Sequence, residues 1–354
     1  MRSFQGITDP REATPPATRL DFFFLSLMRD PRDLPFVHLT LKICLTIVPL
    51  GILLFMPWLT GLAWWGVALL YFYLNNLVFK GPFGLMLHCT SHRPWFKKEY
   101  DWLNYFLPWI VSPFFGQTPE TYFGHHIGMH HPENNLDEDK STTMYYQRDS
   151  FRGFLKYFGL FMAVGFVDLF SYLKAKNRSR LAYKALAGEL SFFLLCIGLA
   201  FVSLKATIVV FLLPFFIFRF IAMLGNWAQH AFVDARDPGN AYKNSVTCIN
   251  VRYNHKCWND GYHIGHHIRP ALHWTQHPDF FLKHLDEYAE NQALVFEGLD
   301  FGRIFILLMR KRYDTLASHL VNVHDAFEND EEVIALMKRR CQRIPRPEAR
   351  ELVH

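Results

Sequence analysis

The chain has 354 residues, of which 51% are hydrophobic, and it carries 37 basic and 32 acidic side chains. Its formal net charge of +5 is small for this length and is not clustered, which argues against nucleic acid as a partner and allows at most contact with anionic lipid head groups. Hydrophobic residues concentrate in two blocks and charged residues fill the rest. This pattern is typical of an integral membrane protein with a substantial aqueous part.

The N-terminal segment, residues 1–35, is polar and rich in proline. It contains no apolar core followed by a cleavage site, so we expect a cytosolic arm and no secretory signal peptide. The first membrane span itself should then direct insertion.

The two hydrophobic blocks are each long enough for two membrane-spanning helices of about 20 residues. The first block is interrupted at residues 57–61 and the second at residues 203–205. The predicted spans cover residues 36–58, 60–79, 185–204 and 206–225. We therefore expect an all-α membrane protein with four transmembrane helices in two hairpins.

Basic residues indicate which side of the membrane each segment occupies. Nearly all of them lie in the N-terminal arm, in residues 80–184 and from residue 226 onward. These parts and both termini should be cytoplasmic, in a bacterial inner membrane or the endoplasmic reticulum. Residues 36–280 are expected to form one membrane domain with a cytosolic helical cap, followed by a cytosolic helical extension over residues 281–354.

Several segments depart from this simple pattern. Residues 102–116 and 151–173 are apolar but interrupted by Pro, Asp or Lys, so we expect interfacial or re-entrant helices there. Tyr71, Asn75, Asn76 and Arg219 are polar exceptions within the spans, and Arg219 is expected to extend toward the lipid head groups, with contact to the substrate as the alternative. In the extension, residues 329–332 should open a helix that ends at residues 338–340.

Nine histidines occur in four clusters, each at a border between apolar and polar sequence. The clusters are His88 and His92 (HCTSH), His126, His130 and His131 (HIGMHH), His230 with Asn226 (NWAQH), and His263, His266 and His267 (HIGHH). The predicted topology puts all four on one side of the membrane. On a helix, a spacing of three or four residues places imidazoles on one face, whereas adjacent imidazoles diverge by about 100° and can serve two ions.

This arrangement predicts a site for two metal ions, because nine ligands exceed what one ion can use. Imidazole suits iron, zinc, copper and nickel, so the ligands alone do not name the metal. A divalent-metal transporter is a distant alternative, but its ligands should lie inside the spans together with carboxylates. The six cysteines contain no CxxC pair and are expected to be reduced thiols, with Cys89 a bystander beside His88.

The clusters and the hairpin topology resemble the membrane-bound fatty acid desaturase and hydroxylase superfamily over roughly residues 36–280. The resemblance implies four transmembrane helices, a cytosolic cap and a non-haem di-iron centre that uses O2. It implies iron ligation by all nine histidines. It also implies that Asn226 lies beside the metals and does not bind them directly. The implied activity is desaturation of an acyl lipid or acyl thioester.

Hydroxylation of a lipid or alkane is the alternative reaction. The HxxxHH spacing of the second cluster is similar to that of alkane and xylene hydroxylases, whereas Asp260 to His267 of the last cluster is closer to lipid desaturases. Both reactions need electrons. We find no haem-binding segment, flavin fingerprint or ferredoxin cysteines, so we expect no bound flavin or haem and a separate donor of cytochrome b5, ferredoxin or rubredoxin type.

Other residues near the clusters are open to two interpretations. His125 could replace His126 as a ligand or lie just outside the ligands. His255, His273 and His277 are expected to be interfacial, with a hydrogen-bonding role toward the ligands as the alternative. Residues 133–139 should form a solvated turn, unless one of their carboxylates holds a ligating imidazole.

Overall fold

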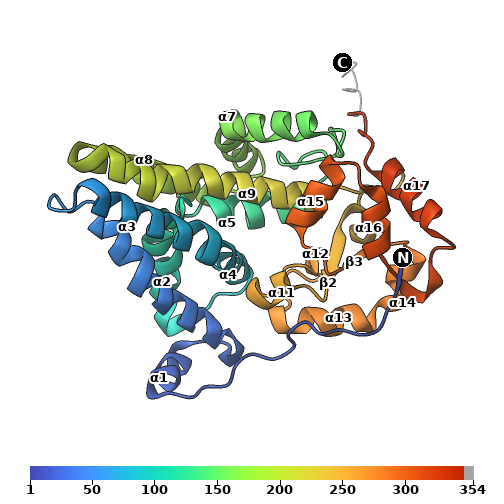
Figure 1. Cartoon of the computed structure of the whole chain (residues 1–354), viewed down its shortest axis with the longest axis horizontal. Helices are drawn as coiled ribbons and strands as arrows, with labels where there is room; N and C mark the ends of the chain where they lie inside the picture. The colour runs from blue at the N-terminus through green and yellow to red at the C-terminus, as the bar shows by residue number, and fades with distance from the viewer. Residues whose placement is uncertain (347–354) are drawn as a thin grey trace.

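A computed structural model describes residues 1–346, and these are folded mainly into helices with four short strands (Figure 1). The strands are β1 (Arg2–Ser3), β2 (Val246–Ile249), β3 (Leu294–Glu297) and β4 (Val321–Asn322). They pair in parallel as β1 with β4 and β2 with β3. The predicted all-α class is confirmed apart from these two small ladders. The end of the expected extension, residues 347–354, lies outside the described residues.

Four helical segments are long and apolar enough to cross a membrane: Pro31–Leu53, Gly61–His92, Phe151–Ala175 and Ser179–Gln229. The first contains α2 (Leu34–Leu53), and the second runs through α3 (Gly61–Tyr73), η2 (Leu74–Phe79) and α4 (Lys80–His92). The second segment has 32 residues and is about 48 Å long, which exceeds the hydrocarbon thickness of about 30 Å. The segment is therefore longer than one crossing requires, and its last turns carry His88 and His92.

The segment Ser179–Gln229 contains a break at Ser203, where φ is −158° and ψ is 102°. It comprises α8 (Ser179–Thr207), η7 (Ile208–Leu212) and α9 (Leu213–Gln229). Glu189 Oε1 lies 2.6 Å from Arg219 Nη2, and the rings of Phe192 and Phe215 are stacked 5.6 Å apart. Residues equally far from the break are thus in contact, as in an antiparallel helical hairpin.

Helix α7 (Phe151–Ala175) lies against the end of this hairpin that is far from Ser203. Near its start, Phe154 contacts Phe220 and Trp227 of α9, with ring centroids 5.6 Å apart in both pairs. Near its end, Leu173 packs with Ala182 of α8. Both ends of α7 therefore meet the same end of the hairpin. This placement supports an interfacial helix, although the length and composition of α7 would also allow a span.

The segment before the second histidine cluster is irregular, with the short elements η3 (Lys98–Tyr105), η4 (Leu107–Val111) and η5 (Ser112–Phe115). Its carbonyls are bound by polar side chains of the long helices. Phe114 O accepts from the Tyr71 hydroxyl and the Asn75 amide, both at 2.9 Å, and Phe115 O accepts from Lys80 Nζ at 2.9 Å. Irregular backbone at membrane depth needs such internal partners, which explains why these polar residues occur in the spans.

The remaining elements form a cap of short helices at one end of the long helices (Figure 1). They are α5 (Thr121–His125), η6 (His126–His130), α6 (His131–Glu133), α10 (Ala241–Asn244), α11 (Arg252–Lys256), α12 (His263–Ile268), η8 (Trp274–Gln276), α13 (His277–Lys283), α14 (Leu285–Glu290), α15 (Phe301–Met309), α16 (Tyr313–His319), η9 (Val323–Asp325) and α17 (Asp330–Arg340). Helix α17 begins after its Asn329 cap, as the sequence predicts.

The N-terminal arm is bound to this cap. It contains α1 (Arg19–Leu27) and is followed by η1 (Pro31–Asp33). The arm runs along α13 toward α14 (Figure 1), and β1 completes a ladder with β4. Asp9 is buried and accepts hydrogen bonds from the Tyr262 hydroxyl at 2.7 Å and the Asn254 amide at 3.0 Å. Tyr262 precedes the last histidine cluster, so the arm helps to fix that cluster.

We expect Gly188→Ala to destabilise the protein by about 1–3 kcal/mol, because α8 approaches the backbone of residue 119 too closely for a side chain. A Cβ at Gly188 would lie 1.6 Å from Pro119 O. Gly198→Ala is the matched control in the same helix, since nothing lies within 4 Å of its Cβ position. Thermal unfolding in detergent should show a lower Tm for Gly188→Ala alone. Equal Tm values for the two variants would contradict this prediction.

Candidate metal centre

The structure places all nine clustered histidines around one point and sorts them into two groups. The first group contains His88, His92, His126, His131 and His266, and the second contains His130, His230, His263 and His267. Within each group, one ring nitrogen from every residue lies within 4.8 Å of the others. Adjacent histidines are divided between the groups, as expected from their angular separation on a helix.

The ring nitrogens that face each other are Nε2 atoms. In the first group the Nε2 separations are 2.9 Å for His88 and His266, 3.0 Å for His92 and His126, 3.1 Å for His126 and His131, and 2.9 Å for His131 and His266. In the second they are 3.2 Å for His230 and His263 and 3.0 Å for His263 and His267. Two ligands at right angles, each about 2.1 Å from one ion, would be about 3.0 Å apart.

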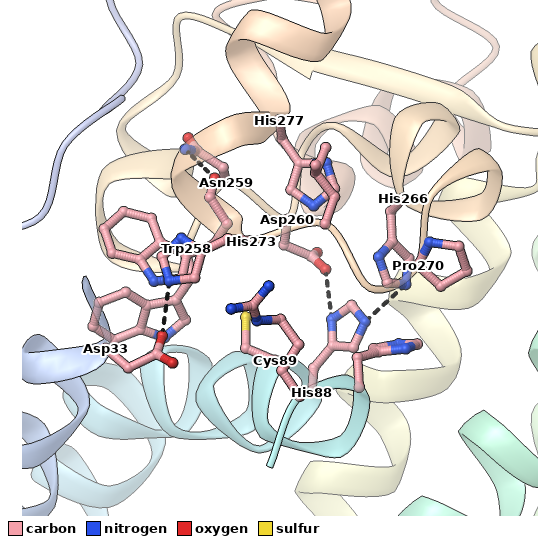
Figure 2. A pocket seen from close by; sticks show the side chains of 14 residues that line it. Asp33, His88, Cys89, Trp258, Asn259, Asp260, His266, Pro270, His273 and His277 are labelled. Carbon is pink, nitrogen blue, oxygen red and sulfur yellow. Dashed lines mark hydrogen bonds and ion pairs between the residues drawn. The ribbon is translucent and has the colours of Figure 1, made fainter. Parts of the chain in front are cut away.

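The opposite ring nitrogens of three histidines have fixed acceptors. His88 Nδ1 lies 3.2 Å from Asp260, and His130 Nδ1 lies 2.8 Å from Asp139. His230 Nδ1 lies 3.0 Å from the carbonyl of Asn244. An acceptor at Nδ1 keeps the proton there, so Nε2 offers a lone pair. Figure 2 shows Asp260 and His266 meeting the two nitrogens of His88. Facing lone pairs about 3 Å apart repel, and a cation between them removes that repulsion. Both groups therefore fit metal ions.

The second cluster depends on a local distortion that its spacing does not reveal. In an α-helix, His126 and His130 would share a face because they are four residues apart. Here His126–His130 forms the π-helical turn η6. Its wider turn brings residues five apart into line, so His126 joins His131 while His130 turns to the second group. The expectation that a spacing of three or four residues pairs imidazoles is wrong for His126 and His130. It is also wrong for His263 and His266, which are three residues apart in α12 and belong to different groups.

Three residues hold the imidazoles through their outer nitrogens: Asp139, Asp260 and Asn244. Asp139 fulfils the alternative stated for residues 133–139, whereas Asp260 and Asn244 were not singled out from the sequence in that role. For Asp139, the expectation of a solvated turn over residues 133–139 is wrong, because its side chain is 1% exposed and bound to His130. Asp137 and Glu138 of the same turn are exposed, as expected. For Asp260 the only sequence signal was proximity, because it precedes His263 by three residues. Asn244 gave no signal, because its position depends on a loop that folds back over His230.

Asn226 and His125 lie beside the groups and belong to neither. The Asn226 amide donates to the Tyr157 hydroxyl at 2.7 Å and to Ser141 O at 3.0 Å. His125 Nε2 is buried without a hydrogen-bond partner. Both residues line a cavity that adjoins the histidines.

The three histidines that lie near the last cluster in the sequence but outside it, His255, His273 and His277, differ in burial. His255 is exposed. His273 and His277 are buried, so the expectation that they are interfacial is wrong for both. His273 binds Asp33 at 3.0 Å in the cap, next to a cavity of about 30 Å³ that Cys89 also lines (Figure 2). All six cysteines are free, as expected, and Cys89 belongs to neither metal group.

A larger cavity of about 290 Å³ reaches both groups of histidines and extends between α4, α7 and α9. Its walls include His88, His126, His130 and His263 at one end and phenylalanine, leucine, isoleucine and glycine residues elsewhere. Arg219 also lines it, and its guanidinium is bound to Glu189 inside the protein. The expectation that Arg219 extends toward the lipid head groups is therefore wrong. A long apolar molecule in this cavity would touch the histidines.

The metal-free protein should lose stability as the pH falls from about 6.5 toward 4. Burial and neighbouring histidines lower the pKa of His263, His266 and His267, and they lower the pKa of His230 to about 4. The unfolded chain, with ordinary histidine pKa values near 6.5, then binds more protons in this window. Thermal unfolding of chelator-treated protein should give a lower Tm at pH 5 than at pH 7.5. A Tm that is unchanged or higher at pH 5 would refute this expectation.

Burial would raise the pKa of Asp139, but the charge and hydrogen bond of His130 outweigh it and lower that pKa to about 2. The depressed carboxyl pKa contributes stability above about pH 4, where an unfolded aspartate is ionised, and that contribution is lost only toward pH 2. It therefore does not oppose the histidine effect between pH 4 and 6.5.

A comparison with known proteins identifies the class. No curated protein and no solved structure matched the chain. Residues 63–298 match the family model described as fatty acid desaturase, and this match covers two thirds of the sequence and all four histidine clusters. With its long apolar helices and two groups of histidines, the chain belongs to the fatty acid desaturase family, and it is an integral membrane oxidoreductase.

Proposed function

We propose that this protein is an O2-dependent desaturase that inserts a double bond into the acyl chain of a lipid or thioester. The observation that carries the proposal is the cavity of about 290 Å³, whose mainly apolar walls end at both groups of histidines. Removal of hydrogen from an unactivated methylene needs a strong oxidant kept away from water, and a dry apolar cavity provides that environment.

The nine histidines would hold two iron ions, five residues in the first group and four in the second. When bound, iron would supply the activation of O2 that this reaction requires. The protein's own contribution is to hold the imidazoles neutral and oriented: Asp139, Asp260 and Asn244 keep protons on the outer nitrogens of three of them. The aromatic and aliphatic walls of the cavity would hold the acyl chain against this centre.

The chain would work at the cytoplasmic face of its membrane, with the cap and both termini on that side, because nearly all basic residues lie in those parts. We retain the division into an N-terminal arm, a membrane domain over residues 36–280 and a C-terminal extension as part of the proposal. Electrons would come from a separate carrier of cytochrome b5, ferredoxin or rubredoxin type.

Hydroxylation is the second candidate, and the HxxxHH spacing of His126, His130 and His131 favours it. The two reactions share the metal centre and the cavity. They differ in whether the substrate radical loses a second hydrogen or gains a hydroxyl group.

Expression beside a His267→Ala control tests the proposal. Bound iron is measured in the purified proteins, and total fatty acids of the host are profiled by mass spectrometry. New double bonds with the wild type alone, and iron near two per chain, are the expected result. New hydroxy acids would replace desaturation by hydroxylation. Protein that binds zinc without iron and forms no product would overturn the proposal.

A further inference from the structure

A second cavity, much smaller than the one proposed for the acyl chain, adjoins the first group of histidines (Figure 2). His88, His92 and His266 of that group line it. Its volume of about 30 Å³ is room for about two water molecules. The two cavities have His88 and Asp260 in common, whereas the other residues around the small cavity do not line the large one. The small cavity is therefore a separate approach to the histidines.

Four residues around this cavity have buried polar atoms without a hydrogen-bond partner among residues 1–346. The atoms are Arg93 Nε, Asn259 Oδ1, Trp274 Nε1 and His277 Nδ1. The last three belong to residues that are 1%, 6% and 6% exposed. Buried polar groups without partners are costly, so four of them around one cavity point to a ligand that bonds to them.

These atoms require a small ligand that both donates and accepts hydrogen bonds. Arg93 Nε and Trp274 Nε1 can only donate, whereas Asn259 Oδ1 can only accept. O2 has no hydrogen to donate, so it does not meet this requirement. Asp33 and Asp260 line the cavity together with Arg93, and side chains of both charge types favour neither a cation nor an anion. Water fits both the size of the cavity and its bonding groups.

The cavity also lies close to the surface of the cap. Arg93, Pro270 and Leu272 line it and are partly exposed. The Arg93 guanidinium donates to the Asp30 carboxylate at 2.6 Å and to Ala271 O at 3.3 Å. Residues at the protein surface and residues of the first group of histidines therefore line the same small space.

The proposed reaction needs such a connection, because it consumes protons and releases water. Desaturation breaks two C–H bonds and forms one carbon–carbon double bond. O2 takes up those two hydrogen atoms, two protons from solvent and two electrons from the carrier, and gives two water molecules. Hydroxylation likewise consumes two protons and releases one water molecule. An acyl chain in the mainly apolar cavity would leave no room for water on that side.

We propose that the small cavity holds ordered water and is the path by which protons reach the histidine groups and water leaves them, while the acyl chain fills the larger cavity. The water would bond to the unpartnered atoms of Asn259, Trp274 and His277. The presence of water follows from the cavity walls alone, whereas its role as a path rests on the proposed function.

Hydroxyl-radical labelling by X-ray radiolysis tests the presence of water, because ordered water beside a buried side chain forms radicals that oxidise it. Full-length protein in nanodiscs is irradiated, and the oxidation of each tryptophan is measured by mass spectrometry. Trp274 should be oxidised faster than Trp227, which is buried and donates its Nε1 hydrogen to Arg148 O at 2.9 Å. Equal rates for these two tryptophans would overturn the proposal.

Two substitutions of Cys89, which lines the cavity, form a matched pair. Cys89→Leu adds bulk and should lower the oxidation of Trp274 to the rate of Trp227. Cys89→Ala leaves the space open and should keep the wild-type rate. Trp102 is 70% exposed and reports the radical dose in every sample. An unchanged Trp274 rate in folded Cys89→Leu protein would contradict the proposal.

A cryo-electron microscopy map of the wild-type protein, at a resolution that shows water, gives the same answer without a substitution. Density within hydrogen-bond distance of Trp274 Nε1 and His277 Nδ1 is expected. A map that shows ordered water elsewhere in the cap and none in this cavity would refute its hydration.

Turnover tests the role of the water separately from its presence. Cys89→Leu should keep its iron content and its KM for the lipid, whereas most of kcat should be lost. D2O should lower kcat more in this variant than in the wild type, because proton transfer would then limit the rate. Wild-type turnover in a variant that has lost Trp274 oxidation would overturn the role as a path. Wild-type protein without iron or product would count against the proposed function and leave the labelling result unaffected.

Discussion

Replacing His126 or His263 by alanine should abolish activity and remove metal, because these residues are central to the two groups. His126 Nε2 lies 3.0 Å from that of His92 and 3.1 Å from that of His131. His263 Nε2 lies 3.2 Å from that of His230 and 3.0 Å from that of His267. Iron in the purified variants should fall to about one per chain or less, because each substitution removes one ligand from one group.

The measurement is iron per chain by mass spectrometry together with product formation. His255→Ala is the matched control, because His255 is exposed and lies outside both groups. It should retain the iron content and activity of the wild type. Full iron occupancy in either His126→Ala or His263→Ala would show that the groups in the structure are not the ligand sets.

Asp139→Asn should weaken metal binding by about 10–100-fold while the protein still folds. Asp139 is buried, accepts from His130 Nδ1 at 2.8 Å and also accepts from the Ser141 hydroxyl at 2.6 Å. An amide can turn its NH2 group toward the imidazole, which then favours the wrong tautomer and a less basic Nε2. The loss of metal affinity should exceed the loss that the small change in side-chain size alone would cause.

Titration of iron into chelator-treated protein measures this effect, with activity as a second readout. Asp137→Asn is the control, since Asp137 lies two residues away on the exposed side of the same loop. It should leave the affinity unchanged. If Asp139→Asn binds iron as tightly as Asp137→Asn, then the carboxylate does not orient the imidazole.

The membrane helices and the break at Ser203 were accessible from sequence because both are local properties. Hydropathy over about 20 residues measures whether a helix is stable in lipid. The break follows from Ser203 and Lys205, which lie between two apolar runs. The Arg219 interaction was not accessible, because its partner Glu189 is 30 residues away and meets it only when the hairpin closes. A lone cation in an apolar run looks the same whether it faces lipid or a buried carboxylate.

The histidine clusters show the same division within the site. Spacing assigned His88 and His92 to one helix face, and the structure puts both in the first group. Spacing failed at His126 and His130, because a π-helical turn changes the number of residues per turn and is set by packing around it. It also failed at His263 and His266, which are three residues apart in α12 and belong to different groups. Asp139 was foreseen only within the alternative for residues 133–139. Asn244 escaped prediction, since the loop that brings it to His230 leaves no periodic signal.

The sequence by itself therefore determined the helical membrane class, the identity of the nine candidate ligands and the expectation of two metals. Hydropathy, composition and ligand chemistry are properties of the residues themselves. Only the tertiary structure decided how the nine imidazoles divide into five and four, which groups hold their outer nitrogens, and that a mainly apolar cavity reaches them. These features depend on distances between segments far apart in the chain. Such distances are fixed by the packing of α4, α9 and α12 and not by local residue patterns.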